Sequence, residues 1–256
     1  NIEEPDPDDE SVPVLLQNNS IVTPFEAVTG MYSLPGRHDI DPTAILAPFY
    51  FLFFGLMLSD AAYGLILTTL CAIILKKYKP EGTTHRMIKM FMFCGLSTFM
   101  WGALFGGWFG NFFTVAAKTF FGKEFVIKPL WFDPLSEPMK LLVVSLILGA
   151  IHLFVGMGVQ AYMDIKDGRP LDALFDIGLW YLLLIGIVLF AFGGKLGAGA
   201  VGIGKIMAII GAVGILLTGG RKKKGIFGKL TGGLGSLYGI TSYLSDVLSY
   251  SRLLAL

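Results

Sequence analysis

Long apolar stretches with almost no charge are the feature that most limits how this chain can fold. Residues 43–75 contain one charged residue, Asp60, and residues 90–117 contain none. Such stretches match helices that cross a bilayer. The composition agrees, because 54% of the 256 residues are hydrophobic and only 15% are charged, with a mean hydropathy of +0.68. We therefore predict an all-α, polytopic membrane protein.

The first apolar stretch is too long for one membrane crossing. A single helix over its 33 residues would be about 50 Å long, whereas the hydrocarbon core of a bilayer is about 30 Å thick. We expect two short helices that turn at Ser59 and Asp60, and an interfacial loop over residues 118–137. Five further spans make about seven in all: 90–117, 141–163, 177–194, 206–220 and the segment from Leu230 onward.

Lysine and arginine are unevenly distributed between the predicted connections. Twelve follow the second, fourth and sixth spans, and five lie in the interfacial loop 118–137 and in the connection after the fifth span. Cytoplasmic connections are enriched in these residues, so the first set and the N-terminal side are predicted to be cytoplasmic. The twelve are Lys76, Lys77, Lys79, Arg86, Lys89, Lys166, Arg169, Arg221, Lys222, Lys223, Lys224 and Lys229, and the five are Lys118, Lys123, Lys128, Lys195 and Lys205.

Residues 1–42 differ in composition from the rest of the chain. They begin with acidic residues and are broken by proline and glycine, without the pattern of a signal peptide. We predict that residues 1–42 are a cytoplasmic linker from a soluble N-terminal domain, and that residues 43–256 are the transmembrane domain. The formal net charge of +1 favours no nucleic-acid partner. The cysteines, Cys71 and Cys94, have no metal-ligand spacing, so no metal site is expected.

Four ionisable residues lie within the predicted spans or their tight turns: Asp60, His152, Asp246 and Arg252. A charged Asp, Lys or Arg at mid-membrane costs about 2.5–3.5 kcal/mol on insertion scales, so each needs a partner, a hydrated cavity or a function. Arg252 is the most informative of the four, because a guanidinium stays protonated and cannot escape the cost by becoming neutral.

A stripe of hydroxyl groups leads along the last predicted span to Arg252. At 100° per residue these side chains fall within about 60° of Arg252 on one helical face. The structural alternative is that Arg252 forms a salt bridge to another helix or extends to the interface. The stripe consists of Tyr238, Thr241, Ser245 and Ser249.

The other three ionisable residues leave alternatives open. Asp246 lies about 120° from Arg252, so it either lines a hydrated path from the cytoplasm or makes a structural contact with another span. His152, which we place nearer the cytoplasmic end of its span, is either functional or a hydrogen-bonded packing histidine. Asp60 either ends a tight turn or lines an aqueous pocket from the outer side.

Three segments resemble a known family. These are FFGLMLSDAAYGLIL around Asp60, WGALFGGWFGNFF, and SDVLSYSRLLAL ending at Leu256. They are similar to the membrane domain of subunit I, the a subunit, of V-type and A-type rotary ATPases, and the resemblance covers essentially the whole chain. Their spelling is closer to the bacterial and archaeal branch than to the vacuolar one, which implies a multi-pass protein of a prokaryotic cell membrane.

The resemblance implies a stator subunit with two offset ion half-channels. Its partners would be a rotating ring of membrane subunits, each with a buried carboxylate, and the peripheral and central stalk subunits. Protons or sodium ions would be the transported ions. Arg252 matches the essential arginine of the family. Asp60 would belong to the outer half-channel, and Asp246 and His152 are the candidates for the cytoplasmic one.

The resemblance also indicates what this chain does not do or contain. No Walker-type glycine-lysine loop occurs, so the chain is not expected to be an enzyme on its own, and no cofactor is implied. ATP turnover would belong to partner subunits. The family has a large N-terminal domain and an eighth helix, which we expect to be missing from this sequence.

Two other functions are compatible with the residues. An independent secondary transporter or channel would use Arg252 to bind an anion, although no internal repeat is visible. A non-conducting assembly or anchoring protein would use Arg252 only for a salt bridge between helices.

Overall fold

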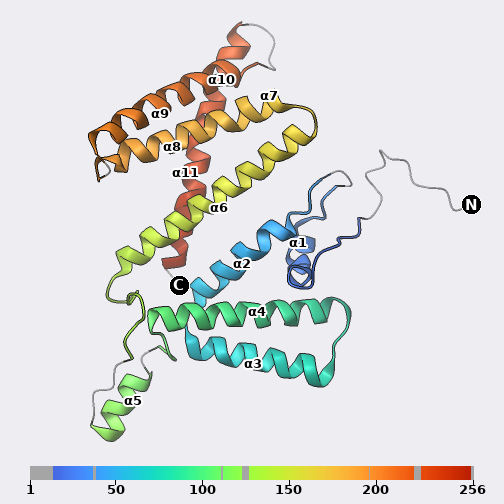
Figure 1. Cartoon of the computed structure of the whole chain (residues 1–256), viewed down its shortest axis with the longest axis vertical. Coiled ribbons are helices and arrows are strands. Elements are labelled where there is room, and N and C mark those ends of the chain that lie inside the picture. Colours follow the sequence, from blue (N-terminus) through green and yellow to red (C-terminus); the bar gives the residue numbers. More distant parts are fainter. Residues whose placement is uncertain are drawn as a thin grey trace, which may run out of the picture. The chain divides into compact units, whose positions relative to one another are not determined.

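The computed structural model describes residues 14–36, 39–110, 112–122, 127–195, 197–221 and 226–254. These residues form helices and no strand (Figure 1). The chain divides into two compact units, which are described separately. The first unit is Asn1–Val144 with Arg252–Leu256, and the second is Ser145–Ser251.

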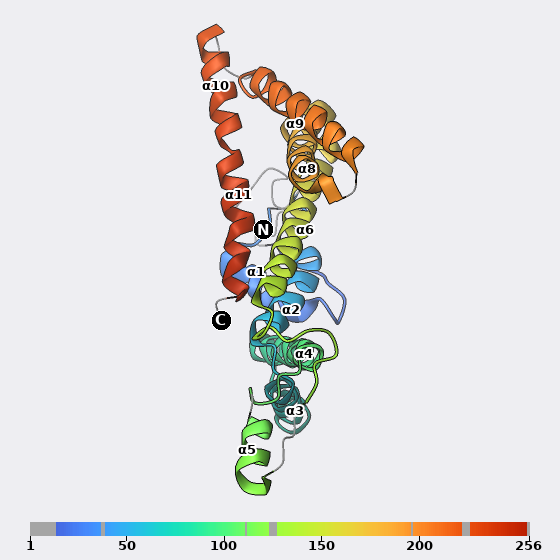
Figure 2. The ribbon, with the colours of Figure 1, turned by 90° about the vertical axis from the view of Figure 1, so that its left-hand side faces the viewer.

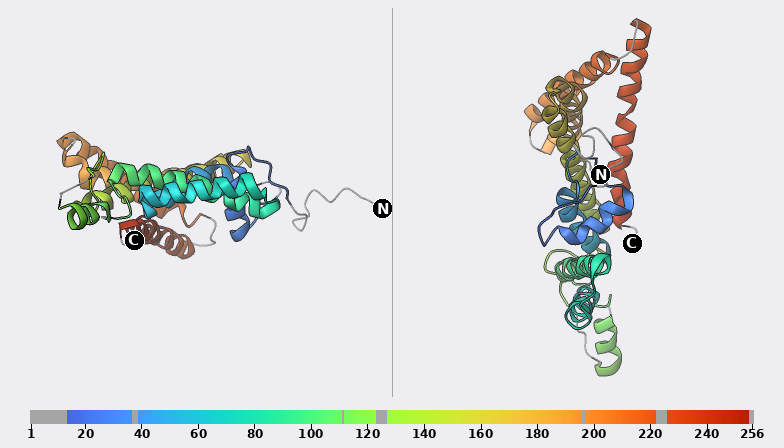
Figure 3. Two further views of the ribbon diagram at one scale, coloured as in Figure 1. Left: turned by 90° about the horizontal axis from the view of Figure 1, so that it is seen from below. Right: turned by 90° about the vertical axis from the view of Figure 1, so that its right-hand side faces the viewer.

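The first apolar stretch folds as the predicted helical hairpin. Helix α2 (Thr43–Leu58) ends at Ser59, which has a left-handed backbone, and α3 (Ala61–Tyr78) starts directly after Asp60. Helix α4 (Gly82–Phe105) then returns along α3, and Figure 3 shows the two lying side by side. A Cβ on Gly64 of α3 would overlap the backbone of α4, so these helices pack with their backbones in close approach.

The prediction for the third span was wrong at both ends. The uncharged stretch 90–117 is not one helix, because α4 ends at Phe105 and a separate helix, α5 (Phe112–Phe121), follows. Between them Gly106 and Gly110 adopt positive φ angles of 76° and 61°, which stop a right-handed helix. At its start, α4 extends back to Gly82 and so includes basic residues that we had assigned to a connection.

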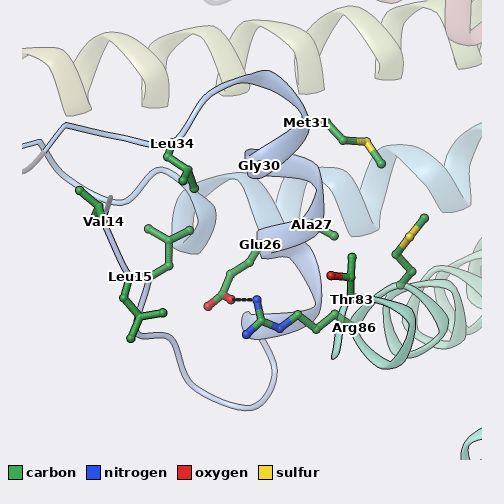
Figure 4. A pocket seen from close by; sticks show the side chains of 11 residues that line it. Val14, Leu15, Glu26, Ala27, Gly30, Met31, Leu34, Thr83 and Arg86 are labelled. Atoms are coloured by element: carbon green, nitrogen blue, oxygen red, sulfur yellow. Dashed lines mark ion pairs between the residues drawn. The ribbon is translucent and has the colours of Figure 1, made fainter. Parts of the chain in front are cut away.

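One of those basic residues, Arg86, ties the segment before α2 to α4. The 3-10 helix η1 (Thr23–Phe25) and α1 (Glu26–Tyr32) pack against α4. The side chain of Glu26 is 4% exposed and pairs with Arg86 at 2.9 Å, beside a cavity of about 400 Å³ (Figure 4). Residues 23–32 are thus packed on membrane helices, while the predicted boundary at residues 42 and 43 stays a prediction.

The second unit contains two long packed helices and most of a third. Helices α8 and α9 lie side by side (Figure 1), and a Cβ on Gly186 would overlap the backbone of α9. Met157 of α6 joins Trp180 and Ile215 in the buried core. The elements up to residue 218 are α6 (Pro138–Lys166), α7 (Pro170–Asp172), the π-helix η2 (Ala173–Gly178), α8 (Leu179–Phe192), the 3-10 helix η3 (Gly193–Lys195) and α9 (Ala198–Thr218).

The predicted seventh span consists of three helical elements. Figure 2 shows α10 (Ile226–Tyr238) and α11 (Ile240–Ser249) in line as one rod. The chain then tightens into the 3-10 helix η4 (Tyr250–Leu254), which carries Arg252.

Length and apolar composition make five helical segments of the described chain candidate membrane spans. They correspond to the second to sixth predicted spans, and the shorter apolar helix α2 corresponds to the first. The predicted all-α, polytopic membrane fold is therefore confirmed. The five are Ala61–Tyr78, Gly82–Phe105, Pro138–Lys166, Pro170–Phe192 and Gly199–Thr218.

Candidate ion-translocation site

The side chain of Arg252 is exposed at the middle of η4. Within the part of the chain that the structure describes, no ion pair or hydrogen bond involves its guanidinium. The interhelical salt bridge considered above is therefore not found among these residues. A guanidinium is a permanent cation with five donors, and none of these donors is used by the described residues.

The hydroxyl stripe lies on an exposed face of α10 and α11. Two of its members donate to nearby backbone carbonyls, Thr241 of α11 to Tyr238 at the end of α10 at 2.8 Å and Ser249 to Asp246 within α11 at 2.6 Å. Another face of α11 is packed, because the Tyr243 ring contacts the Trp180 ring in a tilted arrangement with ring centroids 4.7 Å apart. All four members of the stripe are exposed: Tyr238, Thr241, Ser245 and Ser249.

The side chain of Asp246 is also exposed on α11. Only its backbone carbonyl takes part in a side-chain hydrogen bond, which it accepts from Ser249. Among the described residues, its carboxylate therefore neither caps a kink nor pairs with another span.

Asp60, in contrast, is 8% exposed and organises the backbone around it. Its Oδ1 accepts hydrogen bonds from the amides of Ala62 and Tyr63 at 3.0 and 3.1 Å, which caps the start of α3. Its Oδ2 accepts from the amide of Gly110 at 2.8 Å, and Gly107 accepts from Ala61 next to it. Asp60 thus ends the tight turn, which is the structural role that the sequence left open.

A cavity of about 690 Å³ in the first unit also borders Asp60. Leu253, the residue after Arg252, belongs to the same unit and lines the cavity as well. A second carboxylate in the lining, Asp133, was missed by the sequence analysis. Its Oδ1 accepts from the amide of Leu135 at 2.9 Å. The only sequence signal was its place in the polar loop, where an acidic residue is unremarkable.

His152 lies at the middle of α6, fourteen residues from either end, and not nearer one end as we had expected. Its Nδ1 and the hydroxyl oxygen of Tyr250 are 2.5 Å apart and hydrogen-bonded. Tyr250 was not among the predicted site residues. Its position two residues before Arg252, within the SDVLSYSRLLAL segment, was the only signal for it.

A charge network joins Arg221, which follows α9, to α7 and η2. Arg221 pairs with Asp172 at 2.5 Å and with Asp176 at 2.8 Å, and Arg169 pairs with Asp164 at 3.3 Å. Burial acts to lower the pKa of Arg221, but the hydrogen bonds that it donates to Asp176 and Asp172, together with the charges of these carboxylates, outweigh burial and raise the pKa. These contacts bring the residue that follows α9 next to the start of the helical segment Pro170–Phe192.

The fold defines an all-α polytopic membrane protein, and its last helical turn carries an exposed arginine. No protein-family model matches the chain, but curated relatives align with all of it. A-type ATP synthase subunit I of Methanocaldococcus jannaschii is 34% identical over 284 residues, covering 100% of this chain and 39% of the relative. The same subunit of Thermococcus kodakarensis is 34% identical, with 100% and 38% covered.

A more distant relative is V-type ATP synthase subunit I of Chlamydia trachomatis, which is 24% identical over 99% of this chain and 46% of its own length. The chain therefore belongs to the family of A-type and V-type ATP synthase subunit I, as its motifs indicated. It spans about two-fifths of the length of the A-type relatives.

Proposed function

We propose that this chain is the membrane part of a rotary ATPase stator, which supplies the ion path past a rotating ring. The observation that carries the proposal is Arg252, a permanent cation without a partner among the described residues, on an exposed helix. The similarity of the chain to A-type ATP synthase subunit I supports the same function.

The charge of Arg252 suits this task physically. A fixed cation in a low dielectric attracts a deprotonated ring carboxylate and repels a migrating cation. Ions then cannot pass directly between the two half-channels, so they cross the membrane only as the ring turns. The exposed hydroxyl stripe beside Arg252 supplies polar contacts for the ring surface that passes it.

We assign the two half-channels from the surroundings of Asp60, Asp246 and His152. We place the outer half-channel at the cavity bordered by Asp60, because Leu253 lines the same cavity and adjoins Arg252 in the chain. Asp246, exposed on α11, and His152 are our candidates for the cytoplasmic half-channel. The ions would be protons or sodium ions, and the chain would contain no nucleotide site.

The proposed partners and setting follow from the same function. A ring of membrane subunits with buried carboxylates would contact the exposed face of α11, and the peripheral and central stalk subunits would complete the machine. The chain would lie in a prokaryotic cell membrane with its N-terminal side in the cytoplasm. This orientation rests on the lysine and arginine distribution.

The test is ATP-driven ion uptake into vesicles that contain the complete complex. Wild type is compared with Arg252→Ala and Arg252→Lys in the full-length subunit, with assembly measured on the same membranes. We expect Arg252→Ala complexes to assemble and to lose uptake. Normal uptake would exclude the role of Arg252. Loss of assembly in both variants would favour a structural role instead.

A further inference from the structure

The 3-10 helix that carries Arg252 is anchored at its first residue. At Tyr250 the chain leaves α11, and its backbone amide donates to the carbonyls of Val247 and Leu248. Helices of the 3-10 type have poorer hydrogen-bond geometry than α-helices and seldom exceed three or four residues. The five residues of η4 therefore need support from outside the helix, and Tyr250 provides a contact of that kind.

Two residues of α6 receive the side chain of Tyr250. The end of α11 lies beside α6 in both Figure 1 and Figure 2. A Cβ on Gly149 would overlap the Tyr250 ring, so the absence of a side chain there makes room for the ring. His152 follows three residues later, on the same helical face. Its Nδ1 is 2.5 Å from the Tyr250 hydroxyl oxygen, with the two rings nearly perpendicular at 85°.

This contact bears directly on the direction of Arg252. From Tyr250 to Arg252 a 3-10 helix turns about 240°, whereas an α-helix would turn about 200°. A change between the two conformations would therefore redirect the arginine side chain by about 40° around the helix axis. In the 3-10 conformation the Tyr250 ring fits beside Gly149 and its hydroxyl is hydrogen-bonded to His152. These two contacts therefore favour the 3-10 conformation.

We propose that Tyr250 and His152 are positioning residues, which hold the helix turn that presents Arg252 to the ring. This inference rests on the proposed function and deepens it. It gives His152 a task that is exerted through Tyr250 and Arg252. The two residues are 98 apart in sequence and couple η4 to α6, so the direction of Arg252 depends on α6.

The experiment measures coupling in vesicles that contain the complete complex. The readout is the rate of ATP-driven ion uptake divided by the rate of ATP hydrolysis, with assembly measured on the same vesicles. We expect Tyr250→Phe and His152→Leu each to lower this ratio by about three- to tenfold, the range for one hydrogen bond. His152→Asn, which keeps a hydrogen-bonding group near Nδ1, should restore part of the ratio.

Two comparisons make the result specific to the pair. The double variant Tyr250→Phe with His152→Leu should be no worse than either single variant, because both remove the same hydrogen bond. Tyr243→Phe is the matched control on α11, since its hydroxyl makes no hydrogen bond among the described residues. It should keep the wild-type ratio.

Several outcomes would overturn the positioning role. These are an unchanged ratio in Tyr250→Phe, a double variant whose loss is the product of the two single losses, and loss of assembly in both single variants. Arg252→Ala in the same assay separates this inference from the proposed function. If Arg252→Ala abolishes uptake while Tyr250→Phe is normal, only the positioning role fails. If Arg252→Ala is normal, the proposed function fails.

Discussion

Asp60 and Arg252 both lie within predicted spans or their turns, yet their surroundings are opposite. Asp60 is buried, and both of its carboxylate oxygens accept backbone hydrogen bonds. Arg252 is exposed and has no partner among the described residues. A buried, hydrogen-bonded charge fixes the backbone around it, whereas an unpartnered one is available to an ion or another subunit. Charge within a membrane segment therefore does not identify a functional residue until its partners are known.

Replacing Asp60 should have the largest effect on stability. Asp60→Ala removes the acceptor for three backbone amides, so we expect the free energy of unfolding to fall by about 2–4 kcal/mol. The measurement is thermal unfolding of the purified complex together with the amount of subunit in membranes. Asp60→Asn is the matched control, because Asn caps helices as well as Asp does and loses only the contact to Gly110. Equal stability of wild type and Asp60→Ala would contradict the structural role.

Two glycine-to-alanine variants extend the comparison to packing. A Cβ on Gly102 would overlap the backbone of Asp60 and Ala61, so Gly102→Ala should destabilise the chain by about 1–3 kcal/mol. Gly202 in α9 has no atom near its Cβ position. Gly202→Ala should therefore stabilise the helix by about 0.5–1 kcal/mol. Thermal unfolding of both variants measures the sign of each stability change. Unfolding temperatures that shift in the same direction would contradict the close packing at Gly102 and the open space at Gly202.

Two arginines test whether an ion-paired residue supports stability and an unpaired one supports ion uptake. Arg86→Gln leaves the buried Glu26 carboxylate without its cation, which should cost about 1–2 kcal/mol. Arg252→Gln breaks no contact among the described residues, so we expect unchanged unfolding and lost ion uptake. Measuring both properties on both variants sharpens the contrast. A large loss of stability in Arg252→Gln would reveal a structural partner of Arg252 and contradict this contrast between the two arginines.

The smallest effect should come from Asp41, just before α2. Burial acts to raise its pKa, but hydrogen bonds from Thr43 and Asn18 outweigh this and lower the pKa below its ordinary value of 3.8. The stabilisation is therefore present above pH 3.8 and is lost as the pH falls through the lower, folded pKa. The protection of the Thr43 amide against hydrogen exchange, relative to its intrinsic exchange rate at each pH, should fall in this acidic range. Asp41→Asn should weaken the pH dependence of this protection. An unchanged pH profile in Asp41→Asn would contradict the role of the Asp41 carboxylate.

The sequence was sufficient for the hairpin because one charged residue divides a stretch too long for one crossing. It failed at the third span, where an uncharged run conceals a turn built on Gly106 and Gly110. It could not decide the role of Asp60, because the contact to Gly110 joins residues 50 apart. The contact between His152 and Tyr250 is equally non-local. Helical periodicity describes one helix and cannot predict which other helix lies against it.

The central claim is that the exposed face of α11 beside Arg252 contacts the rotating ring. It is tested most directly by disulfide cross-linking in the complete complex, between a cysteine next to the ring carboxylate and either Ser249→Cys or Val247→Cys. Ser249 is exposed on the hydroxyl stripe, whereas Val247 is half-buried and about 140° from Arg252 on an ideal helix. We predict cross-links from Ser249→Cys and few from Val247→Cys. Cross-links from Val247→Cys alone, or from neither in an active complex, would contradict the account.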